Sequence, residues 1–256
     1  MIVVAGSDYT QINPIQTDDS FYLPSCAMSC IAFVAGTYLP ASCSVSDYTA
    51  RLHACLRDRG IESVVLTTHY AVEAAYDPHA LGVVHGWRWT DLKALVKAVW
   101  DSGADALHIQ YHPRIYGYRA AILLLPLLLR LSGWRSPIIV TVHEYGSWEW
   151  QSQVLPVQFS AWLKRWGQRY QWWDRESGFL LTLSDAVITN IPAAKSLIQA
   201  RLPNMDRRLH AATEPIDCPE KQTQQGETSQ VCIESFNWQN ITQQHLEIYQ
   251  SLVISN

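Results

Sequence analysis

A chain of 256 residues, 48% of them hydrophobic and only 16% charged, can bury a sizeable core, which excludes a disordered protein and fits one large or two small domains. The formal net charge of -4 gives no basic footprint, so we expect no nucleic acid partner. Six cysteines without paired Cys-x-x-Cys spacing favour reduced thiols in a cytoplasmic protein, with no metal at Cys26 and Cys30.

The N-terminal segment does not have the pattern of a secretion signal. No basic region follows Met1, and the short apolar stretch over residues 2–5 gives way to polar residues. We therefore expect residues 1–28 to be a disordered leader outside the fold.

Short apolar runs alternate with longer amphipathic segments from Ser29 onward, as is typical of βαβ units. Strands are predicted at 30–35, 63–67, 82–85, 106–111, 138–143 and 186–190. Helices are predicted at 44–60, 90–101, 117–131, 157–173 and from Pro192. Ser44 and Asp47 have the spacing of a capping box at the start of the first helix. The pattern predicts an α/β fold over residues 29–212, with a Rossmann-like parallel sheet flanked by helices.

The composition changes after Ala212. A polar stretch rich in Gln, Glu and Thr predicts a linker over residues 213–232. Apolar residues then recur at helical spacing from Trp238 to Leu252, with Asn237 as a cap. One final helix is therefore expected within residues 233–256.

The longest apolar stretch, residues 120–129, is about half of the ~20 residues that span a bilayer, and Pro126 interrupts it. We expect no transmembrane helix. This leucine-rich segment could rest on a membrane surface, but packing on the sheet is the favoured interpretation.

Ligands of an open parallel sheet bind beyond the carboxyl ends of its strands. The first such point is the start of the helix at residue 44, where small residues, hydroxyls and helix N-terminal amides could hold a phosphate or a polyhydroxylated ligand. An ordinary capped helix explains the same spacing. The candidate acceptor- or phosphate-binding residues are Ser44, Val45, Ser46, Asp47 and Tyr48.

Two further strand ends supply candidate substrate-binding residues. They are Gln110, Tyr111 and His112 after one strand and Asn190 after another. His108 and His112 lie on one face of a strand but roughly 13 Å apart, too far to share a zinc ion. We therefore predict that His108 is a structural histidine.

The most apolar strand ends with an ionisable pair, His143 and Glu144, which we take as the candidate catalytic residues. The histidine can donate to a hydroxyl or phosphate oxygen, and the carboxylate can accept from a sugar hydroxyl. An alternative is that both are merely exposed at a strand end. A metal-dependent hydrolase built on His112, His143 and Glu144 is the weakest hypothesis, because no third ligand is fixed, and no metal site is predicted.

Tryptophans are concentrated between residues 148 and 173. Trp148 and Trp150 lie in a loop and could stack on sugars, whereas Trp162, Trp166 and Trp173 share one helical face and are predicted to be core.

Taken in order, four stretches resemble the N-terminal domain of family 4-like glycosyltransferases, retaining enzymes of GT-B fold that move a sugar from a nucleotide to an acceptor. They are residues 36–49, 108–113, 141–144 and 184–190. The resemblance implies a Rossmann-like acceptor domain whose first loop contacts the bound substrate and whose His143 faces the transferred sugar. The corresponding loop of the family has a glycine where this chain has Ser44.

Family members carry a second Rossmann-like domain, which binds the nucleotide. Only 44 residues follow Ala212, fewer than such a domain needs. Residues 236–249 resemble the final helix of these enzymes, which packs back on the N-terminal domain. We therefore expect that most of the donor domain is missing and that this chain alone does not transfer sugar.

The resemblance implies a nucleotide sugar of UDP or GDP type as co-substrate, no tightly bound cofactor, and a glycan or lipid-linked sugar acceptor. We also consider a partner chain that supplies a donor domain, and we expect a cytoplasmic location that permits peripheral contact with the inner face of a membrane. The alternative is a non-catalytic glycan-binding or assembly module that pairs with a separate chain.

Overall fold

The computed structural model describes residues 28–40, 43–75, 77–151, 156–212 and 227–254. The expected leader lies outside these residues except for Met28. That side chain is only 5% exposed and packs in the core, so the fold begins one residue earlier than expected.

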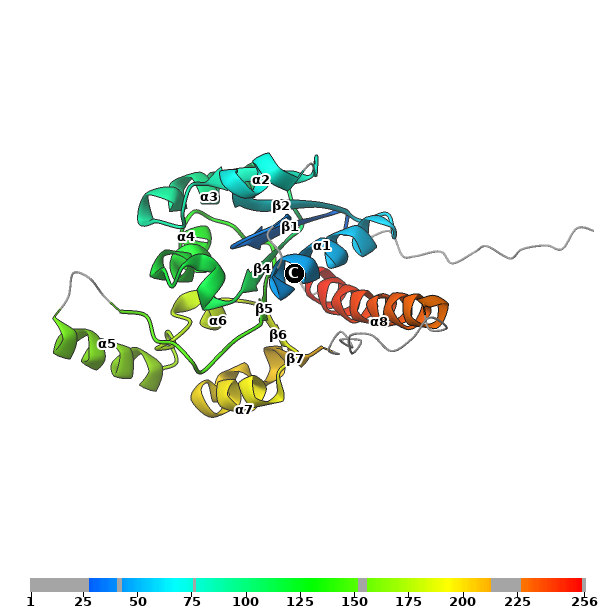
Figure 1. Cartoon of the computed structure of the whole chain (residues 1–256). Helices are drawn as coiled ribbons and strands as arrows, with labels where there is room; N and C mark the ends of the chain where they lie inside the picture. Colours follow the sequence, from blue (N-terminus) through cyan, green and yellow to red (C-terminus); the bar gives the residue numbers. More distant parts are fainter. Residues whose placement is uncertain (1–27, 41–42, 76, 152–155, 213–226, 255–256) are drawn as a thin grey trace, which may run out of the picture.

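A single sheet of seven parallel strands organises the domain, in the order β3-β2-β1-β4-β5-β6-β7 (Figure 1). The strands are β1 Cys30–Ala35, β2 Glu62–Thr68, β3 Ala80–Val84, β4 Ala106–Tyr111, β5 Ile138–Val142, β6 Ala186–Thr189 and β7 Leu209–Ala211. All six predicted strands are confirmed. The seventh, β7, was not predicted because three residues are too short to show an apolar alternation.

Helices cover both faces of this sheet. They are α1 Ser44–Arg57, α2 His69–Ala75, α3 Leu92–Asp101, α4 Leu125–Leu131, α5 Val157–Arg169, α6 Phe179–Thr182, α7 Pro192–Arg201 and α8 Glu227–Ile254. Short 3₁₀ helices occur at Trp89–Asp91, Pro113–Tyr116, Ala120–Leu124 and Pro203–Arg208. α1 and α8 lie on one face, and α3, α4 and α6 lie on the other (Figure 1).

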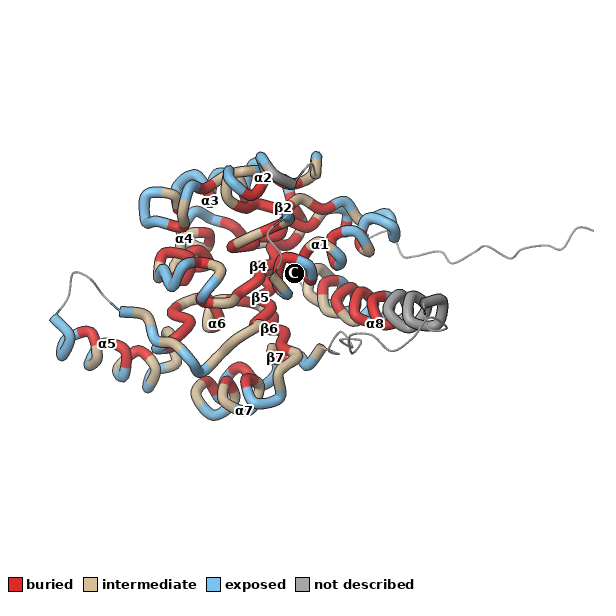
Figure 2. Tube along the Cα trace, viewed as in Figure 1, coloured by how far each residue is buried: buried red, intermediate tan, exposed pale blue. Residues whose placement is uncertain are grey.

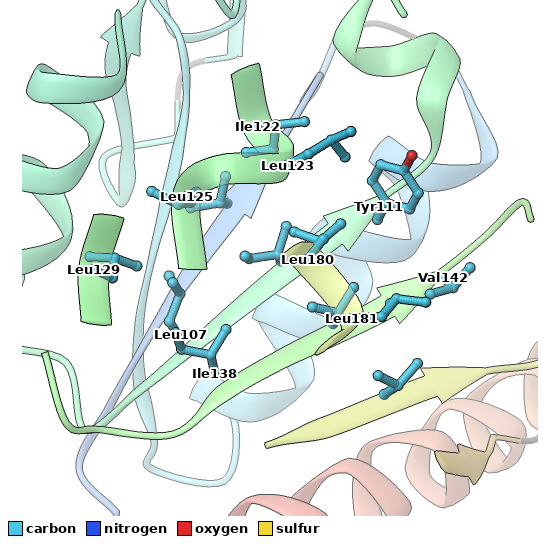
Figure 3. Packing of buried hydrophobic residues seen from close by; sticks show 14 of the residues in the cluster. Leu107, Tyr111, Ile122, Leu123, Leu125, Leu129, Ile138, Val142, Leu180 and Leu181 are labelled. Carbon is cyan, nitrogen blue, oxygen red and sulfur yellow. The ribbon is translucent and has the colours of Figure 1, made fainter. Parts of the chain in front are cut away.

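The alternation of side chains along each strand builds a separate core on each face. In β1, Ala32 and Val34 face the α3, α4 and α6 side, whereas Ile31 and Phe33 face α1 and α8. Figure 3 shows the first core, where β4 and β5 side chains meet leucines of α4 and α6. Each fully buried leucine of this kind contributes about 1.5–3 kcal/mol. The buried stripe follows the sheet through the whole domain (Figure 2).

The leucine-rich segment does pack on the sheet, as Leu125 and Leu129 are fully buried. It is not the single helix that was predicted over residues 117–131. Gly117 adopts a left-handed conformation, with φ 61°, that ends one 3₁₀ helix, and Pro126 fits the first turn of α4, where its missing amide proton costs nothing. Among the described helices, none has the length and apolar character to cross a bilayer.

Three other predicted boundaries are wrong. α1 is capped by Cys43 and not by Ser44, because the Cys43 sulfur accepts from the Ser46 amide and the Ser46 hydroxyl accepts from the Cys43 amide. α5 ends at Arg169, since Gln171 takes a positive φ of 58°. α8 begins at Glu227, inside the expected linker, so Asn237 lies within the helix and is not its cap.

Candidate functional site

The strand register brings the predicted site residues of three strands into one row at the carboxyl edge of the sheet. Tyr111 pairs with Val142, and Thr141 pairs with Ile188. Continued past the strand ends, these registers set His143 between His112 and Asn190. All three side chains are partly exposed, so the row faces the open edge of the sheet.

A chain of buried hydrogen bonds holds the His143 ring. Its Nε2 lies 2.8 Å from Gln110 Oε1, and Gln110 Nε2 lies 3.3 Å from His108 Nε2. His108 is fully buried and also bonds Thr141 Oγ1 at 2.7 Å and the Tyr249 hydroxyl at 2.5 Å. His108 is thus a structural histidine, as predicted.

The hydrogen-bond partners determine which nitrogen of the His143 and His108 rings carries the proton. Gln110 Oε1 can only accept, so His143 donates from Nε2. Gln110 Nε2 can only donate, so His108 Nε2 accepts, and His108 Nδ1 donates to Tyr249. The Nδ1 atom of His143 is therefore its lone-pair nitrogen, able to accept a hydrogen bond from a ligand hydroxyl.

Burial of the imidazole, with nearby His112 and His245 as smaller causes, lowers the pKa of His143 to about 3. Burial also lowers the pKa of His245 to about 4 and that of His108 well below its usual value. His143 is therefore neutral at pH 7, and it can orient a substrate by hydrogen bonding without carrying charge.

A second pair of predicted residues meets beside His143. His112 Nε2 lies 3.0 Å from Glu144 Oε2, and His112 Nδ1 accepts from the Arg114 amide at 3.2 Å. His112 therefore donates from Nε2 to the carboxylate. Glu144 also accepts from the Ser147 hydroxyl, and it remains partly exposed at the edge of the sheet.

The start of α1 contributes fewer accessible side chains than its sequence suggests. Ser44 and Asp47 are exposed, but Val45, Ser46 and Tyr48 are buried. Tyr48 lies beneath α8, its hydroxyl 3.2 Å from His245 Nε2 and its ring 5.1 Å from that of His143. Tyr48 therefore forms part of the wall behind His143.

Two predicted substrate-binding side chains are also enclosed. Gln110 is fully buried and serves the His143 ring, and Tyr111 points to the opposite core with 1% of its surface exposed. Asn190 has a buried Oδ1 without a hydrogen-bond partner among the described residues. Its side chain therefore carries acceptor capacity beside His143 that the protein itself does not use.

Sequence reasoning missed the group that anchors the loop after β5. Glu176 is fully buried, and its two carboxylate oxygens accept from the Gly146 amide at 2.8 and 2.7 Å. Arg201 Nη1, at the end of α7, lies 3.0 Å from Glu176 Oε2. This ion pair fixes the backbone two residues beyond Glu144, and no local motif in the sequence indicates it.

No group of three or more His, Cys, Asp or Glu side chains in the described part of the chain is arranged to hold a metal ion. His143 Nε2 bonds Gln110, and His112 Nε2 faces Glu144. The metal-dependent hydrolase hypothesis therefore gains no support from the geometry of these three residues.

The structure differs from the prediction in which tryptophans are buried and which are exposed. Trp148 and Trp150 are partly buried against the core behind α4 and α6, whereas Trp162, predicted to be core, is 51% exposed. The reason is that α5 packs through a narrow face formed by Ser160, Lys164 and Gly167.

Residues 45–211 match the glycosyl transferase 4-like domain. The chain belongs to this family. The matched region contains the row of His112, His143 and Asn190 together with Glu144, so the site described above lies inside the family domain. This confirms the resemblance inferred from the sequence.

Solved structures with a similar fold include a glycosyltransferase from Rickettsia africae ESF-5, with 11% identity, a TM-score of 0.44, and coverage of 82% of this chain and 50% of that one. An alpha-glucosyltransferase in complex with UDP matches with 13% identity, a TM-score of 0.41, and coverage of 77% and 43%. The glycosyl transferase 4-like chain thus spans about half the length of these structures or less. None of the curated proteins compared with it matches.

We expect the buried histidines of this glycosyl transferase 4-like domain to stay neutral in weak acid. In a histidine NMR titration, the His143 and His245 rings should show no protonation between pH 7 and about pH 5, because burial opposes the charged form. Titration of either ring near 6.5, the value of an added free histidine reference, would contradict the enclosed geometry.

The same shifts give the sign of the stability change. The folded pKa values of about 3 and about 4 lie below the unfolded value of 6.5. As the pH falls below 6.5, these two histidines take up protons in the unfolded chain but not in the folded one. Their effect is therefore to lower the free energy of unfolding progressively between pH 6.5 and the folded pKa values of about 4 and about 3.

Proposed function

We propose that this domain forms the acceptor-side half of a sugar-transfer site, with a nucleotide sugar of UDP or GDP type as co-substrate. The observation that supports this best is His143, a neutral histidine at the carboxyl end of a central strand within the matched family domain. Its ring is held by Gln110, and its Nδ1 remains for a ligand.

The roles of the other edge residues follow from their chemistry. The Glu144 carboxylate can accept from sugar hydroxyls while His112 holds its orientation. Asn190 Oδ1 can accept one more hydrogen bond. A phosphate or hydroxyl of the acceptor would meet the N-terminus of α1 beside the exposed Ser44 and Asp47, because the first amides of a helix have no partner within the helix.

Transfer also requires stabilisation of the leaving nucleotide, which is usually a large catalytic contribution. We assign this contribution to a donor domain on a partner chain. The acceptor would then bind between the two domains, with His143 and Glu144 facing the transferred sugar.

Two measurements test the proposal. The chain is isolated with its natural associates, and sugar transfer from a panel of UDP and GDP sugars is followed by mass spectrometry, beside calorimetric binding of each nucleotide to the purified chain. We expect transfer only by the complex, and His143→Ala should reduce it by about 10²-fold, the usual effect of losing one preorganised group.

The control is Tyr70→Ser, which removes an exposed aromatic ring of α2 and should leave transfer unchanged. Nucleotide binding and transfer by the purified chain alone would overturn the assignment of the donor site to a partner. Glycan binding without transfer by any isolated complex would instead identify a non-catalytic binding module.

A further inference from the structure

Helix α5 and the turn that follows it carry a row of aromatic side chains, most of which are exposed. The aromatic ridge consists of Phe159, Trp162, Trp166, Tyr170 and Trp172. Phe159 and Trp162 stack at 5.6 Å, and Trp162 and Trp166 stack at 6.2 Å. Four of the five rings are 48–57% exposed.

A neighbouring face of α5 attaches the helix to the domain. Gly167 fits against Trp173 so closely that an added Cβ would lie 2.2 Å from the indole ring. Leu163 lines a wholly apolar pocket of about 210 Å³ together with Trp150, Trp173 and Phe179. Folding therefore uses the inner face, and the aromatic ridge remains as an exposed apolar patch, which normally marks an interaction surface.

The charge around the ridge is opposite in sign to that of the chain. Residues 151–173 contain three basic residues and no acidic one, although the chain as a whole has a net charge of -4. Two of the three, Arg165 and Arg169, are exposed beside Trp162 and Trp166 at three-residue spacing. Within the described residues, neither arginine takes part in an ion pair, whereas Lys164 on the inner face pairs with Glu149 at 3.6 Å.

We propose that the outer face of α5 binds an anionic phospholipid surface. Tryptophan, tyrosine and phenylalanine rings are suited to the boundary between headgroups and acyl chains, and arginines at their side attract anionic headgroups. α5 lies at the margin of the domain, farther from the sheet than α4 or α6 (Figure 1), so a flat surface can reach it without meeting the strands.

This contact would set the orientation of the candidate site. The loop after β5 contacts α5, since Glu149, six residues beyond His143, lies 3.6 Å from Lys164, so the contact with lipid would bring this loop near the headgroups. That arrangement suits a lipid-linked acceptor. The surface itself is proposed from α5 and the turn after it and does not depend on sugar transfer.

The test is co-sedimentation of the full chain with vesicles of phosphatidylcholine alone and of phosphatidylcholine containing about one-third phosphatidylglycerol. We expect binding to the anionic vesicles that salt weakens. Phe159→Gln/Trp162→Gln should weaken it by about 10-fold or more, and Arg165→Gln/Arg169→Gln should remove the preference for anionic lipid.

Matched controls change the same chemistry elsewhere on the surface. Tyr70→Gln/Leu131→Gln removes two exposed apolar side chains of α2 and α4, and Arg135→Gln/Arg207→Gln removes two exposed arginines; both should bind like the parent. Unchanged circular dichroism shows that each variant is folded.

Three results would overturn the proposal. The first is that the parent does not bind anionic vesicles, and the second is that the control variants lose as much binding as the ridge variants. The third is that the parent self-associates through the ridge: a ridge variant would then become monomeric in sedimentation velocity while its vesicle binding stays unchanged.

Discussion

Replacing Arg201 with methionine is expected to destabilise the domain by about 1 kcal/mol more at about pH 8 than at about pH 5, because it leaves the Glu176 carboxylate buried without a cation and the carboxylate must then take up a proton. Glu176 is fully buried, and burial raises its pKa to about 7 even though the Gly146 amide and Arg201 favour the ionised form. In the parent, the Gly146 amide and Arg201 offset only part of the free-energy cost of burying the charged carboxylate. Without Arg201, a larger part of this cost remains.

The pH dependence of the Arg201→Met variant has a definite sign. The folded pKa of Glu176 lies above its unfolded value of 4.5. The stability that this group contributes is therefore fully present below pH 4.5 and is lost as the pH rises through the folded pKa. The loss should therefore grow from about pH 5 to about pH 8 in urea denaturation, since the protonated acid needs no partner at the lower pH.

Two controls separate charge from packing. Glu176→Gln/Arg201→Met removes both charges and should show no loss that grows between about pH 5 and about pH 8, because the neutral amide does not titrate and can still accept from the Gly146 amide. Arg207→Met removes an exposed arginine and should change little. An Arg201→Met loss that is the same at both pH values would show that packing against the Tyr145 ring, 5.0 Å from the guanidinium, is what matters.

The strands were predictable because parallel strands covered on both faces appear as apolar runs of four to six residues. β1 and β4 have the predicted ends, 30–35 and 106–111. β7 and α2 were missed, since each is short and carries no clear period. Helix propensity also does not indicate where an α-helix stops and a 3₁₀ helix starts. Residues 113–131 are an example, because they form two 3₁₀ helices and α4 where one helix was predicted over residues 117–131.

The row of site residues was predictable for a topological reason. Parallel strands all end at the same edge, so His112, His143 and Asn190 had to come together once each was placed at the end of its strand. Their partners were not predictable. Tyr249 lies 141 residues from His108, and His245 lies 197 residues from Tyr48, so only the folded chain relates them.

The prediction for α5 was wrong for a related reason. Helical spacing shows that Trp162 and Trp166 share a face, but it does not show whether any other element covers that face. The closely packed side of α5 contains Ser160, Lys164 and Gly167, which a hydrophobicity pattern ranks as the outer side.

Replacing Tyr249 with alanine should destabilise the domain by about 3–5 kcal/mol, the usual cost of truncating a buried aromatic residue. The ring is fully buried between α8 and the sheet, next to His108 and His245. The change opens a cavity and leaves His108 Nδ1 buried without an acceptor. Because His108 also contacts Gln110, the loss should extend to the orientation of His143.

Tyr249→Phe separates the two effects, since it keeps the ring and removes only the hydroxyl. It should cost about 1–3 kcal/mol, the penalty for one unsatisfied buried donor, and Gln250→Ala on the exposed side of α8 should cost almost nothing. Both are measured by urea denaturation beside Tyr249→Ala. If Tyr249→Ala stayed within about 1 kcal/mol of the parent, α8 would not be part of the cooperative fold, and the hydrogen-bond chain from α8 to His143 could not be what holds the site.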